Sequence, residues 1–143
     1  MQFLQVKYGT EKYLQSLLLR YKVLRVPLQL EFSVADFEKD KKDLHLCIFD
    51  DEKIVATCTF AQIAPTRYKM RQVAVDTAIQ QQGIGKKLIA FAEKFAKENG
   101  VTQIECNARE TAVPFYQKMK YEVVGAPFLE VGIPHFFMQK ELY

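Results

Sequence analysis

The stretch Gln80-Gln81-Gln82-Gly83-Ile84-Gly85-Lys86 decides the fold of this chain. It lies between a strand-like run that ends at Val75 and a helix whose apolar residues recur with helical period. The first N–H groups of a helix have no partner within it, and the macrodipole adds positive charge there. A glycine loop that leads into a helix can therefore bind a phosphate. The stretch predicts an anion site; the alternative is a tight turn followed by two solvated lysines.

Lys86 and Lys87 favour the anion site, because cations in the first helical turn cost about 0.3 to 1 kcal/mol unless a negative group compensates them. Two familiar phosphate loops do not match. A Walker loop needs four residues between its glycine and a Gly-Lys-Ser/Thr ending, and this stretch has neither that spacing nor the hydroxyl. The dinucleotide fingerprint needs a third glycine where Leu88 stands.

Hydrophobic periodicity and turn signals predict an α/β fold with a mixed sheet. Thr10 is placed to cap a first helix that ends near Pro27, and Asn99-Gly100 is placed to end the helix after the glycine loop. The expected strands are 3–6, 44–49, 54–63, 68–75, 103–107, 121–124 and 136–142, and the expected helices are 10–26, a short one from Ser33, 84–98 and 112–119.

Composition fits one globular domain over residues 1–143, with 49% apolar and 26% charged residues. No run is long enough to span a membrane, and the N-terminus lacks the pattern of a signal peptide, so a cytoplasmic location is expected. The net charge of +3 is too small and too dispersed to indicate nucleic-acid binding. Three widely spaced cysteines in apolar runs predict neither disulfides nor a metal site. Nothing in the sequence places them beside His45 or His135 for nucleophilic catalysis.

The glycine loop matches the Gln/Arg-x-x-Gly-x-Gly/Ala signature of the GCN5-related N-acetyltransferases (GNAT family), and the chain resembles that family in two further segments. Met70 to Val75 resembles its central strand, and Phe115 to Gly125 resembles its Phe-Tyr-x-Lys-x-Gly-Phe-x-x-x-Gly segment. The resemblance runs from about Leu44 to the C-terminus, and the ending around Glu130 to Met138 looks like a bacterial ElaA-like branch. It implies the GNAT acyl-CoA N-acyltransferase fold, with a central, partly splayed mixed sheet flanked by helices.

The resemblance implies acetyl-CoA as the acyl donor, with its pantetheine arm in the gap between the strands near 68–75 and 103–107. Buried unpaired backbone groups are costly, so the amides of pantetheine can satisfy those that the splay leaves open. The residues that the resemblance assigns to the cofactor are Val73, Ala74 and Val75 on the strand, Gln80, Gln81, Gln82, Gly83, Ile84, Gly85 and Lys86 in the loop, and Asn107.

The implied reaction is transfer of the acetyl group to an amine of a small molecule or peptide by direct attack in a ternary complex. Tyr116 matches the tyrosine that related enzymes use as general acid. Glu130 and His135 are candidates for the base or for the acceptor site, in an expected loop; a water is the alternative base.

Two positions depart from the family pattern. Arg109 stands where many relatives carry asparagine, and Lys120 stands where they carry glycine. A left-handed Lys120 would cost on the order of 1 kcal/mol, so the helix before it is expected to end differently. Two other interpretations stay open: a noncatalytic acyl-CoA-binding or sensory module, and a homodimeric scaffold that uses the β-rich C-terminal part.

Overall fold

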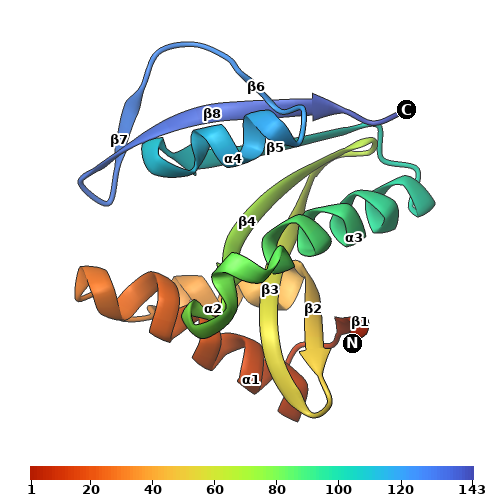
Figure 1. The fold of residues 1–143 in the computed structure, drawn as a ribbon, viewed down its shortest axis with the longest axis vertical. Helices are drawn as coiled ribbons and strands as arrows, with labels where there is room; N and C mark the ends of the chain where they lie inside the picture. The colour runs from red at the N-terminus through yellow and green to blue at the C-terminus, as the bar shows by residue number, and fades with distance from the viewer.

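In the computed structural model, eight strands form one open, mixed sheet with the order β1-β2-β3-β4-β5-β8-β6, and β7 pairs with β8 (Figure 1). The structure describes residues 1–79 and 82–143 in full. For Gln80 and Gln81 it describes only the main chain. The strands are β1 (Gln2–Val6), β2 (Leu44–Asp50), β3 (Lys53–Ala64), β4 (Arg67–Val75), β5 (Gln103–Arg109), β6 (Glu122–Val123), β7 (Phe128–Glu130) and β8 (Ile133–Glu141). The α-helices are α1 (Glu11–Arg20), α2 (Val34–Lys42), α3 (Ile84–Glu98) and α4 (Val113–Lys118).

The predicted order of helices and strands is confirmed, and local signals explain most of the helix ends. The Thr10 side chain accepts a hydrogen bond from the Tyr13 N–H, and Ser33 forms a capping box with Asp36 at the start of α2. Gly100, at φ +77°, ends α3 as predicted. The first helix differs, because it continues past Arg20 as a π-helical segment, η1 (Tyr21–Arg25), and a 3₁₀ turn, η2 (Val26–Leu28). Within the described residues, no helix combines the length and apolar character that crossing a membrane requires.

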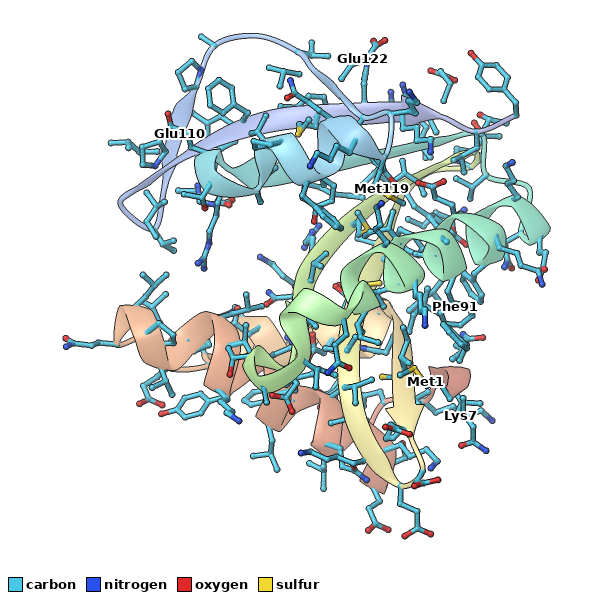
Figure 2. All side chains as sticks on the ribbon, viewed as in Figure 1. Met1, Lys7, Phe91, Glu110, Met119 and Glu122 are labelled. Atoms are coloured by element: carbon cyan, nitrogen blue, oxygen red, sulfur yellow. The ribbon has the colours of Figure 1, made fainter. Side chains whose placement is uncertain are left out.

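Helices cover both faces of the sheet. The larger core cluster joins α3 to the sheet, with Leu88 and Ile104 fully buried. The smaller cluster joins α1 to the other face through Leu19 and Ala74. Figure 2 shows Phe91 of α3 directed toward the N-terminal end of the chain, where its ring meets that of Phe3 edge to face at 5.5 Å.

The parallel strands β4 and β5 diverge. Their register pairs Arg67 with Gln103 and ends at Met70 and Cys106. Beyond that point β4 continues along β3, and β5 continues along β8 (Figure 1). A bulge accompanies the divergence, because Gln72 has φ 54° and the β3–β4 register shifts beside it. The predicted splay is therefore present.

The loop expected to carry Glu130 and His135 is instead a β-hairpin. β7 pairs with β8 from Phe128 opposite His135 to Glu130 opposite Ile133. The connecting residues, Val131 and Gly132, have φ values of 47° and 73°, as a type I′ turn requires. The expectation of a loop was wrong because this turn uses Val-Gly in place of the usual Asn-Gly.

The expectation about Lys120 was also wrong. Lys120 adopts φ 73° after α4, so the helix ends with a left-handed residue although that residue is not glycine. Its N–H donates to the Gln117 carbonyl at 3.0 Å, and the N–H of Tyr121 donates to the Tyr116 carbonyl at 3.0 Å. Tertiary packing of the buried Tyr121 ring outweighs the local cost at Lys120.

Candidate active site

A cleft of about 910 Å³ opens where β4 and β5 diverge. Residues from α1, η1 and α2 form one wall, and residues from β5, α4 and the β7–β8 hairpin form the other. Figure 1 shows these two parts of the chain on either side of the splay. Seven of the predicted site residues line the cleft: Val73, Val75, Gly85, Asn107, Tyr116, Glu130 and His135.

The N-terminus of α3 lies at the mouth of the cleft and is shaped for an anion. Gly83 adopts φ +74°, and none of the described side chains caps the first turn. A Cβ built on Gly83 would meet nothing within 4 Å, so its backbone is open to approach. Lys86 and Lys87 are exposed in the same turn. The arrangement provides helix N–H groups and two nearby cations for a phosphate group.

The glycines of the loop have different roles. Gly85 lines the cleft, and a Cβ on it would stand 3.3 Å from the Phe115 ring, so this glycine allows α3 to pack closely on α4. Ile84 is buried in the core, and Gln82 is exposed. The predicted contacts of Gln80 and Gln81 lie outside the described residues.

The end of β4 brings the predicted strand residues to the cleft in alternation. Val73 and Val75 line the cleft and pack against the larger core cluster. Ala74 faces the other way, where it is buried in the smaller cluster and pairs with Thr57. Backbone groups of this segment can therefore face a ligand in the splay while the side chains remain packed.

Tyr116 is held in the cleft wall by aromatic contacts. Its ring meets Phe115 at 5.1 Å and Tyr121 at 5.5 Å, both edge to face, and the residue is 6% exposed. Burial raises the pKa of the Tyr116 hydroxyl above its ordinary value, and the neighbouring Cys106 acts in the same direction. The phenol therefore stays protonated and can act as a proton donor in the cleft.

Asn107, Glu130 and His135 lie next to one another as a chain of polar side chains. The Asn107 amide donates to Glu130 Oε1 at 3.3 Å, and Glu130 Oε2 lies 3.3 Å from His135 Nε2. His135 Nδ1 lies 2.8 Å from the Ile133 carbonyl, which can only accept, so Nδ1 carries a proton. Nε2 is thus the nitrogen that can take up a proton, and Glu130 stabilises it once it does.

Sequence reasoning missed several charged residues of the cleft. Asp43 and Arg71 line it, and Arg71 lies on a strand where charged residues alternate with the buried Tyr68 and Met70. That alternation is the sequence signal from which Arg71 could have been identified as a residue of the cleft. Burial raises the pKa of the Asp43 carboxyl, although Arg71 acts in the opposite direction.

A buried ion pair was also missed. Arg20 binds Asp40 through two hydrogen bonds of 2.9 and 3.2 Å in the cleft wall. The two residues of this ion pair are twenty positions apart in the sequence, and no local pattern joins them.

The cysteines and His45 offer no nucleophilic site. Burial raises the pKa of Cys47 to about 11 and that of Cys106 to about 12, so both remain thiols at neutral pH. The His45 Nε2 atom lies 2.8 Å from the Asp40 carbonyl, and the ring packs against Tyr13. His45 therefore has a structural role.

Comparisons with known proteins agree with this geometry. The sequence model of the acetyltransferase (GNAT) domain matches residues 29–142. The chain is 30% identical over 117 residues to the uncharacterized N-acetyltransferase YjcF of Bacillus subtilis (strain 168), covering 81% of this chain and 80% of YjcF.

Two solved structures share the fold at lower sequence identity. Escherichia coli ElaA superposes with a TM-score of 0.84 at 18% identity, covering 98% of this chain and 99% of ElaA. An aminoglycoside 6′-N-acetyltransferase complexed with coenzyme A superposes with a TM-score of 0.80 at 16% identity, covering 100% of this chain and 98% of that protein. The match of the domain model to most of the chain decides the assignment: this protein belongs to the GNAT acetyltransferase family.

Proposed function

We propose that this protein is an N-acetyltransferase that moves the acetyl group of acetyl-CoA to an amine of a small molecule or peptide by direct attack in a ternary complex. One observation carries the proposal: the N-terminus of α3, which no described side chain caps, lies beside the splay between β4 and β5. A phosphate site next to a strand that has diverged from its neighbour suits a ligand with a pyrophosphate and an amide-containing arm. The coenzyme A bound to the structurally similar aminoglycoside acetyltransferase has this chemistry.

The residues present fit such a donor. Backbone N–H groups from Gly83 to Lys86 would hold the pyrophosphate, because Gly83 presents no side chain and, outside Gln80 and Gln81, no side chain competes for them as a cap. The segment Val73–Val75 would present backbone groups to the pantetheine arm and the acyl group. Asn107 lies across the splay on β5 and would contribute backbone groups, because its side-chain amide donates to Glu130.

Bound acetyl-CoA supplies an acetyl thioester, and the chain has groups for each step of its transfer. The amine nitrogen forms a bond to the carbonyl carbon, and the carbon–sulfur bond breaks with its electron pair on sulfur. Backbone N–H groups near Val73 stabilise the negative charge that develops on the carbonyl oxygen. Tyr116 donates its hydroxyl proton toward the departing sulfur. Its raised pKa means that this donation acts mainly as a hydrogen bond, because the thiol itself is the stronger acid.

The proton that the attacking ammonium loses goes to the chain formed by Glu130 and His135. Nε2 of His135 is the available acceptor, and Glu130, which is about half exposed, connects it to solvent. The proton moves to Nε2 directly or through one water molecule, and Glu130 balances the resulting positive charge.

The binding step is tested by placing a negative charge in the glycine loop. Gly83→Asp should weaken acetyl-CoA binding at least tenfold, measured by isothermal titration calorimetry, because the carboxylate repels the pyrophosphate. The fold should survive, since an acidic residue at a helix N-terminus is favourable. Gly83→Asn adds a side chain of nearly the same shape without the negative charge, so it measures the steric effect on acetyl-CoA binding alone.

Gly100→Asn is the matched control, because Gly100 ends the same helix at φ +77° with nothing within 4 Å of its Cβ position. It should cost as much stability as Gly83→Asn and leave binding unchanged. Unchanged acetyl-CoA affinity in folded Gly83→Asp protein would refute the site.

The catalytic step is tested with amines. Thiol release from acetyl-CoA should depend on an added amine, and mass spectrometry should find the product acetylated on nitrogen. Tight acetyl-CoA binding without turnover on any amine would instead support the noncatalytic acyl-CoA-binding module.

A further inference from the structure

The cleft carries more positive than negative side chains. Six lysines and arginines line it, against four aspartates and glutamates. Two of the six are held by carboxylates of the cleft wall, Arg20 by Asp40 at 2.9 Å and Arg25 by Asp36 at 3.7 Å. A third carboxylate, Glu130, lies 3.3 Å from His135 Nε2 and accepts a hydrogen bond from Asn107. Most of the negative charge of the cleft is therefore already engaged.

The remaining four cations are Lys39, Lys69, Arg71 and Arg109, and the described part of the chain offers none of them a salt bridge. Lys39 is exposed to solvent, and Lys69 lies opposite Glu105 in the β4–β5 register. Arg71 and Arg109 are half-buried, and their partners in the sheet register, Thr59 and His135, carry no carboxylate.

Arg71 and Arg109 flank the splay on the same face of the sheet. Arg71 directly follows Met70, the last β4 residue paired with β5, and Arg109 is the last residue of β5. Met70 and Ala108, their neighbours in the chain, point to the α3 face and belong to the larger core cluster. Since side chains alternate along a strand, the two arginines point to the opposite face. They therefore face away from the helix proposed to hold the pyrophosphate.

A half-buried guanidinium without a partner loses hydration that nothing in the protein replaces. The one carboxylate left in the cleft, Asp43, interacts electrostatically with Arg71 but forms no salt bridge with it. Guanidinium groups match planar carboxylates and phosphates with paired hydrogen bonds, and two of them on opposite sides of a gap favour an anion between them.

We propose that the acceptor carries a carboxylate or phosphate a few bonds from its amine, and that Arg71 and Arg109 bind this anion while the amine enters the splay. This inference rests on the proposed N-acetyltransferase function. A polycation would place its charges against two uncompensated arginines, so the acceptor differs in charge from the aminoglycosides named for one structural neighbour.

The test compares amines that differ only in the charge of a remote group. β-Alanine, 4-aminobutanoate and 5-aminopentanoate are assayed against their amides, O-phosphoethanolamine against ethanolamine, and kanamycin serves as the polycation. Rates are corrected for the fraction of free amine. Charged hydrogen bonds of this kind correspond to roughly a tenfold to hundredfold preference in kcat/KM for the anionic members. The carboxylate and phosphate series show which anion the site prefers.

Arg71→Gln and Arg109→Gln should each reduce this preference about tenfold, mainly through KM, and leave the Kd of acetyl-CoA unchanged. Arg67→Gln is the control, because Arg67 is exposed at the start of the same strand and does not line the cleft. It should leave the preference intact.

Binding of the N-acetylated products to CoA-loaded protein, measured by calorimetry, gives a readout that needs no turnover. Equal affinity for anionic and neutral members overturns the inference, as does no binding of any member or a loss of acetyl-CoA affinity in the arginine variants. Failure of the wild-type protein to bind acetyl-CoA would refute the proposed function itself, which is a distinguishable result.

Discussion

Asp40→Asn should destabilise this protein far more than any surface change on the same helix. Asp40 is 3% exposed and holds Arg20, itself 1% exposed, through two hydrogen bonds. The Tyr13 hydroxyl also donates to Asp40 Oδ2, at 2.5 Å. Replacing the carboxylate by an amide keeps the shape and leaves the guanidinium buried without a counter-charge.

The magnitude follows from these contacts. Breaking a buried ion pair by removing one partner costs about 3–5 kcal/mol, because the other charge stays uncompensated. Arg20 Nε already has no hydrogen-bond partner among the described residues, so the guanidinium has little other support. For a chain of this size such a loss lowers Tm by about 10–20 °C.

Urea denaturation followed by circular dichroism measures the change. Glu38→Gln is the control, since Glu38 lies on the same helix and pairs with Lys41 at 3.0 Å on the exposed surface. It should have no measurable effect. The double variant Arg20→Met/Asp40→Leu should recover much of the loss, because it removes both charges. Equal stability of Asp40→Asn and Glu38→Gln would refute the importance of the buried pair.

Three further predictions follow from single contacts. Tyr116→Phe keeps the ring packing and should lower kcat about 10²-fold with little change in acetyl-CoA affinity; equal kcat, with chemistry rate-limiting, would exclude a catalytic hydroxyl. Cys47 and Cys106, with pKa values raised by burial to about 11 and about 12, should not react with Ellman's reagent in the folded protein at neutral pH, and rapid labelling would contradict their burial. Lys120→Gly should raise the free energy of unfolding by about 1 kcal/mol, which a lower Tm would disprove.

The fold could be predicted because its signals are local in the sequence. Apolar residues recur with the period of a helix after Gly83 and with that of a strand before it, and caps such as Ser33 and Gly100 stand at the expected ends. The positions of Gly85 and Tyr116 at the cleft could be predicted for the same reason, since each belongs to a short continuous motif.

The individual side-chain contacts on the other side of the cleft could not be predicted, because they join distant segments. Glu130 meets Asn107 across 23 residues, and Asp40 meets Arg20 across 20. The hairpin was missed because Val131 occupies a left-handed position that a β-branched residue rarely adopts. The surrounding pairing of β7 with β8 imposes this conformation, and local preference gave no sign of it.

The bulge at Gln72 explains how one strand can serve two chemically different sides of the cleft. Before the bulge, Arg71 points away from α3, and Met70 points toward it. The extra residue reverses the alternation, so Val73 packs against the α3 cluster and Ala74 against the α1 cluster. A regular strand would instead place Val73 and Val75 on the same face as Lys69 and Arg71, away from α3. The left-handed conformation of Gln72, costly for a non-glycine residue, thus places apolar side chains on the α3 side of the cleft and charged side chains on the other, which is the division that the proposed donor and acceptor sites require.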